Sequence, residues 1–112
     1  MKHRIVLVSF PFDDLASTKV RPAVCLTDAI GPHQHVVLAF ISSRMPGDLL
    51  PSDIIIEDTH PDFSTTGLRV TSVFRLHRIM TAGVAIIRRD LGCVPASFTR
   101  QLRDKLRSLL CA

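Results

Sequence analysis

A short basic cluster in the second half of the chain has the residue types needed for phosphate binding and proton transfer. Residues 75–78 read Arg-Leu-His-Arg. Alternate side chains of a strand share a face, so Arg75 and His77 are expected on one side and Arg78 on the other. A guanidinium stabilises negative charge that develops at a phosphate, and an imidazole exchanges protons near neutral pH. The cluster indicates a phosphate site, with a merely solvated sheet face as the alternative.

Two hydroxyl groups, those of Ser42 and Ser43, follow an apolar run that is expected to form a buried strand. Hydroxyls at a strand end can hydrogen-bond a phosphate or the edge of a base. They can equally close a turn. Both interpretations stay open at this level.

Metal and cofactor sites have weak signatures. Asp13 and Asp14 form a carboxylate pair in a polar loop, and His33 and His35 alternate in a turn, but two ligands of one kind make a poor metal set. No Gly-rich phosphate loop follows a predicted strand. The three cysteines are widely spaced, and we expect them to be buried or incidental thiols. We therefore predict neither a metal nor a cofactor.

The basic residues are unevenly distributed. The 112 residues carry a net charge of +4, yet residues 69–107 hold nine basic and two acidic residues. Eleven of the fourteen basic residues are arginine, which favours bidentate binding of phosphate or carboxylate. The asymmetry favours an anionic partner, with nucleic acid as the first candidate. A solvated face is the alternative.

The elements that must position these residues are short strands followed by one helix. Runs rich in β-branched residues predict six strands, over residues 5–10, 22–27, 35–41, 52–57, 68–76 and 79–85. Their regular spacing predicts a small antiparallel barrel. After Pro95, apolar residues recur at helical spacing and predict an amphipathic helix that covers the barrel, with its stripe at Phe98, Leu102, Leu106, Leu109 and Leu110.

Length and hydropathy indicate a single domain, over residues 1–112, in the cytoplasm. No apolar run reaches the ~18 residues that a membrane helix requires. The opening apolar run is too short for a signal peptide. The mean hydropathy of +0.28 is high for so small a chain and favours a homodimer that covers apolar surface.

Several segments, in order, carry a resemblance to a known family. They are residues 5–15, the Arg-Pro-Ala strand over 19–27, the hydroxyl-terminated strand over 37–43, the segments 66–68 and 72–79, and Leu-Gly at 91–92 before the final helix. Together they resemble the PemK/MazF family, the toxins of type II toxin–antitoxin pairs.

The resemblance implies a structure and an activity. It implies an SH3-like barrel of antiparallel strands with a C-terminal helix, in a homodimer. It implies a metal-independent endoribonuclease, or mRNA interferase, which cleaves single-stranded RNA at short sequences. RNA attacked by its own 2′-hydroxyl leaves a 2′,3′-cyclic phosphate and a 5′-hydroxyl. A cognate antitoxin is implied as the partner that blocks the RNA site.

The functional positions of the family map onto this sequence residue by residue. The arginine before Pro-Ala corresponds to Arg21, and the later strand arginine to Arg75. Some members have an aspartate two residues further on, where this chain has His77. We therefore predict Arg21 and Arg75 as stabilisers of the phosphorane and His77 as general base or acid. The predicted substrate-binding residues are Ser42, Ser43, Lys19 and Arg44.

Three other functions stay open from the sequence. A related toxin family with the same barrel inhibits DNA gyrase without cleaving RNA. A family member that has lost activity would bind only RNA or antitoxin. A small barrel can also serve as a plain interaction module.

Overall fold

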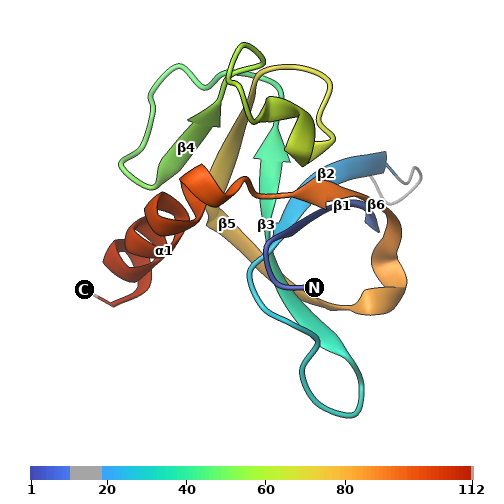
Figure 1. Cartoon of the computed structure of the whole chain (residues 1–112). Helices are drawn as coiled ribbons and strands as arrows, with labels where there is room; N and C mark the ends of the chain where they lie inside the picture. The colour runs from blue at the N-terminus through green and yellow to red at the C-terminus, as the bar shows by residue number, and fades with distance from the viewer. Residues whose placement is uncertain (11–18, 112) are drawn as a thin grey trace.

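The chain folds around one antiparallel sheet with a helix at its C-terminal end (Figure 1). The structure, a computed structural model, describes residues 1–10 and 19–111, with the side chains of residues 10 and 19 left out. Asp13 and Asp14 therefore lie outside the described residues. The elements are β1 (Arg4–Phe10), β2 (Lys19–Cys25), β3 (His35–Ser42), β4 (Asp53–Ile56), η1 (Phe63–Thr66), β5 (Ser72–Gly83), η2 (Val84–Ile86), β6 (Ile87–Cys93) and α1 (Ala96–Leu110).

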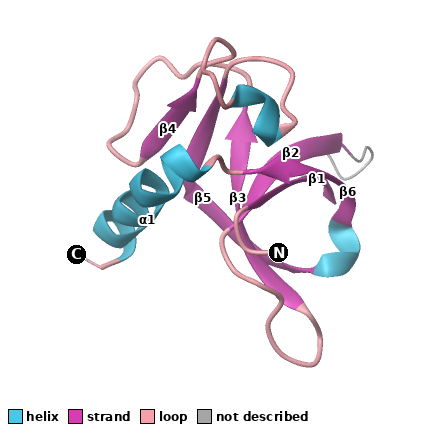
Figure 2. Cartoon of the chain, viewed as in Figure 1, coloured by secondary structure: helices cyan, strands magenta, loops and turns pink. Residues whose placement is uncertain are grey.

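The six strands follow the order β4-β5-β3-β2-β1-β6, and every neighbouring pair is antiparallel. Figure 2 shows the sheet curling around the centre of the molecule, with α1 beside β4 and β5. The predicted fold class is confirmed as mainly antiparallel strands with a C-terminal helix. The barrel is open, however, because β4 and β6 are edge strands and do not pair with each other.

The predicted strands differ from the observed ones in the second half of the chain. Residues 72–83 form one long strand, where two strands were predicted. A bulge interrupts its pairing with β3, since Phe40 pairs with Arg75 while the preceding Ala39 pairs with Ile79. The strand β6 was not predicted, because its exposed residues 88–90 are charged and hide the alternation of a strand.

Each face of the curled sheet buries a cluster of aliphatic side chains. The cluster on the helix side includes Ile5, Val24 and Phe74, which are fully buried. The cluster on the other face includes Val8 and Leu38 and is bordered by Phe40, Met80 and residues of η2. Neighbouring residues of β1 and β2 alternate between the two clusters, as the two-residue period of a strand requires.

The helix α1 seals the first cluster. Leu102 is buried in it, and Phe98 and Leu106 pack against it. This confirms the predicted amphipathic helix. The stripe is only partly covered, since Leu109 and Leu110 at the end of the helix are exposed.

Two glycines allow η1 to lie directly against β6. Gly67 has a positive φ of 71°, and a Cβ there would collide with the backbone of Leu91. A Cβ on Gly92 would collide with the carbonyl groups of Thr65 and Thr66. Only glycine fits such close backbone contacts. The contact fixes the loop after η1 relative to β6.

Burial raises the pKa of the Cys25 thiol, so this cysteine is a core residue with little reactivity. At the N-terminus, the backbone N–H of Lys2 and the terminal ammonium both donate to the Asp28 carboxylate, which lowers its pKa. In the part of the chain that the structure describes, no helix has the length and apolar character needed to cross a membrane.

Candidate functional site

A surface hollow of about 530 Å3 lies where β2 begins and β3 ends. Its polar lining consists of Arg21, Ser42, Ser43 and Arg44, which are four of the seven predicted site residues. The two strands are antiparallel neighbours, so the start of one lies beside the end of the other. The structure therefore brings together residues that are about twenty positions apart in the sequence.

The two serine hydroxyls have different surroundings. The Ser42 hydroxyl accepts a hydrogen bond from the backbone N–H of Arg44 at 3.1 Å and donates to its carbonyl oxygen at 3.2 Å. This hydroxyl closes a turn, which was the alternative interpretation of the pair. Ser43 is exposed, and its hydroxyl bonds to no other residue that the structure describes. Ser43 is therefore the better placed of the two to bind a ligand.

Arg75 is held in place by a buried carboxylate. Its Nε atom lies 3.3 Å from Oδ1 of Asp53, and their side chains are 18% and 1% exposed. The other carboxylate oxygen, Oδ2, accepts a hydrogen bond of 2.8 Å from the backbone N–H of Leu50. Oδ1 accepts no hydrogen bond from the described residues, so Asp53 holds Arg75 through charge and not through a hydrogen bond. This orienting partner was not predicted from the sequence.

Arg75 shares a sheet face with the hollow although it does not line it. Arg75 pairs with Phe40 on β3, and Phe40 pairs with Ala23 on β2. Arg21 is two residues before Ala23, and Ser42 is two residues after Phe40, so these side chains point the same way. The predicted arginines therefore lie on one face, with Phe40 between their strands.

The bulge in β5 changes the predicted position of Arg78. The prediction that Arg78 lies opposite Arg75 is wrong, because its guanidinium carbon sits 5.7 Å from the centre of the Phe40 ring, beside Arg75. Regular alternation fails here because residues 76–78 are left out of the pairing with β3. His77 is exposed and is not among the described residues that line the hollow.

The remaining substrate-binding candidates are Lys19 and Arg44. Lys19 opens β2, two residues before Arg21, which places its Cα near the hollow; its side chain lies outside the described residues. Arg44 is exposed and lines the hollow. Its backbone also holds the hydroxyl of Ser42.

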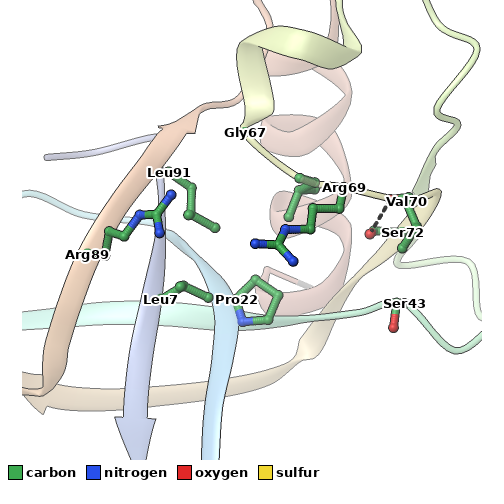
Figure 3. A pocket seen from close by; sticks show the side chains of 10 residues that line it. Leu7, Pro22, Ser43, Gly67, Arg69, Val70, Ser72, Arg89 and Leu91 are labelled. Atoms are coloured by element: carbon green, nitrogen blue, oxygen red, sulfur yellow. Dashed lines mark hydrogen bonds between the residues drawn. The ribbon is translucent and has the colours of Figure 1, made fainter.

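A second cavity, of about 250 Å3, adjoins the first and was not predicted (Figure 3). Leu7, Pro22 and Leu91 form apolar walls, while Arg69 and Arg89 extend into it from opposite sides. The excess of basic residues over 69–107 was a signal for these arginines. It did not single them out, because neither β6 nor its contact with η1 was foreseen.

The site as a whole is cationic and carries hydroxyl groups. Such a surface binds phosphate or carboxylate and stabilises negative charge. Among the described residues, no group of three or more His, Cys, Asp or Glu side chains stands close enough to hold a metal ion.

Comparison with known proteins places this geometry in a family. A family model described as "PemK-like, MazF-like toxin of type II toxin-antitoxin system" matches residues 2–110. A search of curated protein sequences finds no match.

Solved structures share the fold at low sequence identity. The toxin MazF-mt6 of Mycobacterium tuberculosis is 22% identical, with a TM-score of 0.71 over 94% of this chain and 93% of that one. A mycobacterial endoribonuclease solved in complex with its cognate antitoxin is 14% identical, with a TM-score of 0.73 over 99% and 94%. The MazE–MazF complex of Deinococcus radiodurans gives 24% identity and a TM-score of 0.69 over 98% and 94%.

Proposed function

Because the chain belongs to the PemK-like, MazF-like toxins of type II toxin–antitoxin systems, we propose that it is a sequence-specific, metal-independent endoribonuclease. Its substrate is single-stranded RNA, and messenger RNA in the cell. The observation that carries the proposal is the joint placement of Arg21, Ser43 and Arg44 around one hollow, on the sheet that also bears Arg75. Similar folds include proteins described as endoribonucleases.

The proposed reaction uses the RNA as its own nucleophile. The 2′-hydroxyl attacks the adjacent phosphorus, and the bond from phosphorus to the 5′-oxygen of the next nucleotide breaks. The products carry a 2′,3′-cyclic phosphate and a 5′-hydroxyl. The protein has to hold the backbone in line, accept the 2′ proton, stabilise the phosphorane and protonate the leaving oxygen. DNA lacks the 2′-hydroxyl and is not a substrate.

We assign the charge-stabilising roles to Arg21 and Arg75. The ion pair with Asp53 keeps the Arg75 guanidinium on this face of the sheet before charge develops on the phosphate. Ser42, Ser43, Arg44 and Lys19 bind the phosphate or position the nucleotide, with the Ser42 hydroxyl acting through the turn that it closes.

We assign proton transfer to His77. Its exposed position on the bulge leaves the imidazole accessible to a bound backbone. An imidazole has one nitrogen that can accept a proton and one that can donate it, which suits a general acid or base. His77→Gln should lower kcat, whereas a histidine that takes no part in proton transfer could be replaced without changing kcat.

The proposed partners are a second copy of the chain and an antitoxin. Exposed apolar side chains, among them Leu109, Leu110 and Leu49, leave surface that a partner would cover. Related folds have been solved with MazE or with a cognate antitoxin. We expect the protein to act in the cytoplasm, where its messenger substrate is found.

The experiment is cleavage of a mixed-sequence single-stranded RNA by the purified protein in excess chelator. Arg21→Ala should lower the rate about 100- to 1,000-fold, as expected for loss of one preorganised donor to the transition state. Arg88→Ala is the matched control, since Arg88 is exposed and lines neither cavity. Cleavage that survives Arg21→Ala, or that requires a metal, would contradict the proposal.

A second candidate is a family member that binds RNA without cutting it. The buried Asp53 partner favours it, because that ion pair gives Arg75 a structural role independent of catalysis. The same assay separates the two candidates. A folded dimer that binds RNA in a salt-dependent manner but yields no cyclic phosphate is a binder.

A further inference from the structure

Two arginines that the proposed reaction does not use meet in one cavity. Arg69 comes from the loop between η1 and β5, and Arg89 comes from β6. Figure 3 shows both guanidinium groups inside the cavity, reaching toward each other from opposite walls. Like charges that share a small space repel each other until an anion enters between them.

Neither guanidinium is neutralised within the part of the protein that the structure describes. The described lining of the cavity contains no aspartate or glutamate. Asp90, the residue next to Arg89, is bound instead to Arg4, through two hydrogen bonds of 2.7 and 3.0 Å. Two cations thus face one cavity without a carboxylate among its described lining residues, an arrangement that suits the binding of an anion.

Close backbone contacts position the two segments that carry the arginines. Gly67, two residues before Arg69, packs on the backbone of Leu91, which is two residues after Arg89. Gly92 makes a second close contact, with Thr65 and Thr66. The cavity walls are therefore set by backbone packing and not by flexible side chains alone. Binding of an anion then has to order only the two exposed arginine side chains, because the backbone that carries them is already in place.

The cavity adjoins the hollow of the proposed cleavage site. Pro22 and Ser43 line both the cavity and the hollow that holds Arg21. The two spaces thus meet at Pro22 and at Ser43, which is exposed. A polymer that places one phosphate beside Arg21 can reach the cavity with its neighbouring unit.

We propose that Arg69 and Arg89 form a second phosphate subsite, which binds the nucleotide next to the scissile one. One phosphate lies between the two guanidiniums, and the attached base rests on Leu7, Pro22 and Leu91. The inference rests on the proposed function for its substrate. It adds the residues that position the RNA and extends the contact beyond the reacting phosphate.

Shape and lining favour a nucleotide over an acidic peptide. The volume of about 250 Å3 is just below the ~300–1,000 Å3 of drug-sized sites and suits one unit of a polymer. The walls combine two planar guanidinium groups, which can bind a phosphate, with an apolar surface on which a base can lie. A carboxylate side chain would use the arginines but leave the apolar wall formed by Leu7 and Pro22 uncovered.

The test measures binding without cleavage. The probe is a fluorescein-labelled 2′-O-methyl RNA of mixed sequence, which cannot be cut because its 2′-oxygen is blocked. Fluorescence anisotropy gives the Kd at several salt concentrations for the wild type, for Arg69→Gln/Arg89→Gln and for Arg88→Gln. Arg88→Gln is the matched control on β6, and circular dichroism checks that every variant is folded.

The proposal predicts that the double variant binds at least 10-fold more weakly. It also predicts that the slope of log Kd against log salt falls by ~0.7, the value for one lost phosphate contact on a single strand. Arg88→Gln should match the wild type. Replacement by lysine at both positions should restore the slope, because the charge returns.

Equal affinities and slopes for the wild type and the double variant would overturn the proposal. Loss of affinity for a polyglutamate peptide alone would instead identify the cavity as a carboxylate site for a protein partner. The binding result is separate from catalysis. A wild type that binds through Arg69 and Arg89 but never cleaves RNA would refute the proposed function and leave the subsite standing.

Discussion

Two groups of arginines in this small sheet have opposite electrostatic surroundings. Arg75 is largely buried and is paired with an aspartate that is itself almost fully buried. Arg69 and Arg89 are exposed and face each other without an acid among the described residues of their cavity. Asp53 neutralises the charge of Arg75, whereas no described acidic residue forms an ion pair with Arg69 or Arg89.

The contrast shows that residue type alone does not separate structural from binding arginines. A buried ion pair orients a side chain but makes the fold depend on it. Two neighbouring arginines without an acidic partner add little to stability and can bind an anion. Arg75 combines both properties, since its Nε is fixed by Asp53 while no described residue pairs with the rest of its guanidinium. Mutations that separate stability from binding therefore test the comparison directly.

The largest effect on stability is expected from Arg75→Ala. Removing the arginine leaves the carboxylate of Asp53 buried and uncompensated, which costs about 3–5 kcal/mol in the free energy of unfolding. Urea unfolding followed by circular dichroism measures the loss.

Asp53→Asn provides the contrast to Arg75→Ala. It leaves a partly exposed cation that can turn to water, so its cost should be smaller, about 1–3 kcal/mol. Equal stability of the wild type and Arg75→Ala would show that the pair does not hold the fold. The comparison with the second group would then lose its basis.

A smaller effect is expected from Arg78→Ala. The Arg78 guanidinium lies over the ring of Phe40, and such a contact at an exposed site contributes about 0.5–1 kcal/mol. Arg78→Lys should retain part of this stabilisation. A change of more than 2 kcal/mol would mean that the bulge in β5 depends on this side chain, and a change indistinguishable from zero would remove the contact from the account.

The smallest effect on stability is expected at the second group. Arg69→Ala and Arg89→Ala should each change the free energy of unfolding by no more than about 0.5 kcal/mol, as is usual for surface positions. The double variant should be at least as stable as the wild type, because it removes a repulsion. A large loss of stability would show that these arginines hold the fold, like Arg75, and would break the comparison.

Local patterns in the sequence predicted the elements whose signals are local. The spacing of Phe98, Leu102 and Leu106 after Pro95 identified the helix, since a periodic apolar stripe needs no knowledge of its partner. The strand β6 was missed because three consecutive charged residues, over 88–90, conceal its alternation. The bulge in β5 was missed for a related reason, since nothing in residues 75–78 marks where pairing with β3 stops.

The candidate site could be predicted only in part, because local sequence patterns do not show which distant residues come together. Residue type and resemblance identified Arg21 and Ser43, which the structure places around one hollow. The partner of Arg75 was invisible, because Asp53 belongs to another strand and its burial is a property of the whole fold. The pairing of Arg69 with Arg89 depends on two backbone contacts at glycines, which no local pattern reveals.

The central claim is that RNA is cut by its own 2′-hydroxyl on the face that carries Arg21. The most direct test replaces one ribose by deoxyribose at a mapped cleavage position in an otherwise unchanged single-stranded RNA. If the 2′-hydroxyl is the nucleophile, cleavage stops at that position, continues at other sites, and leaves a 2′,3′-cyclic phosphate and a 5′-hydroxyl wherever it occurs. Cleavage after the deoxynucleotide, in excess chelator and by protein purified free of other nucleases, would contradict it.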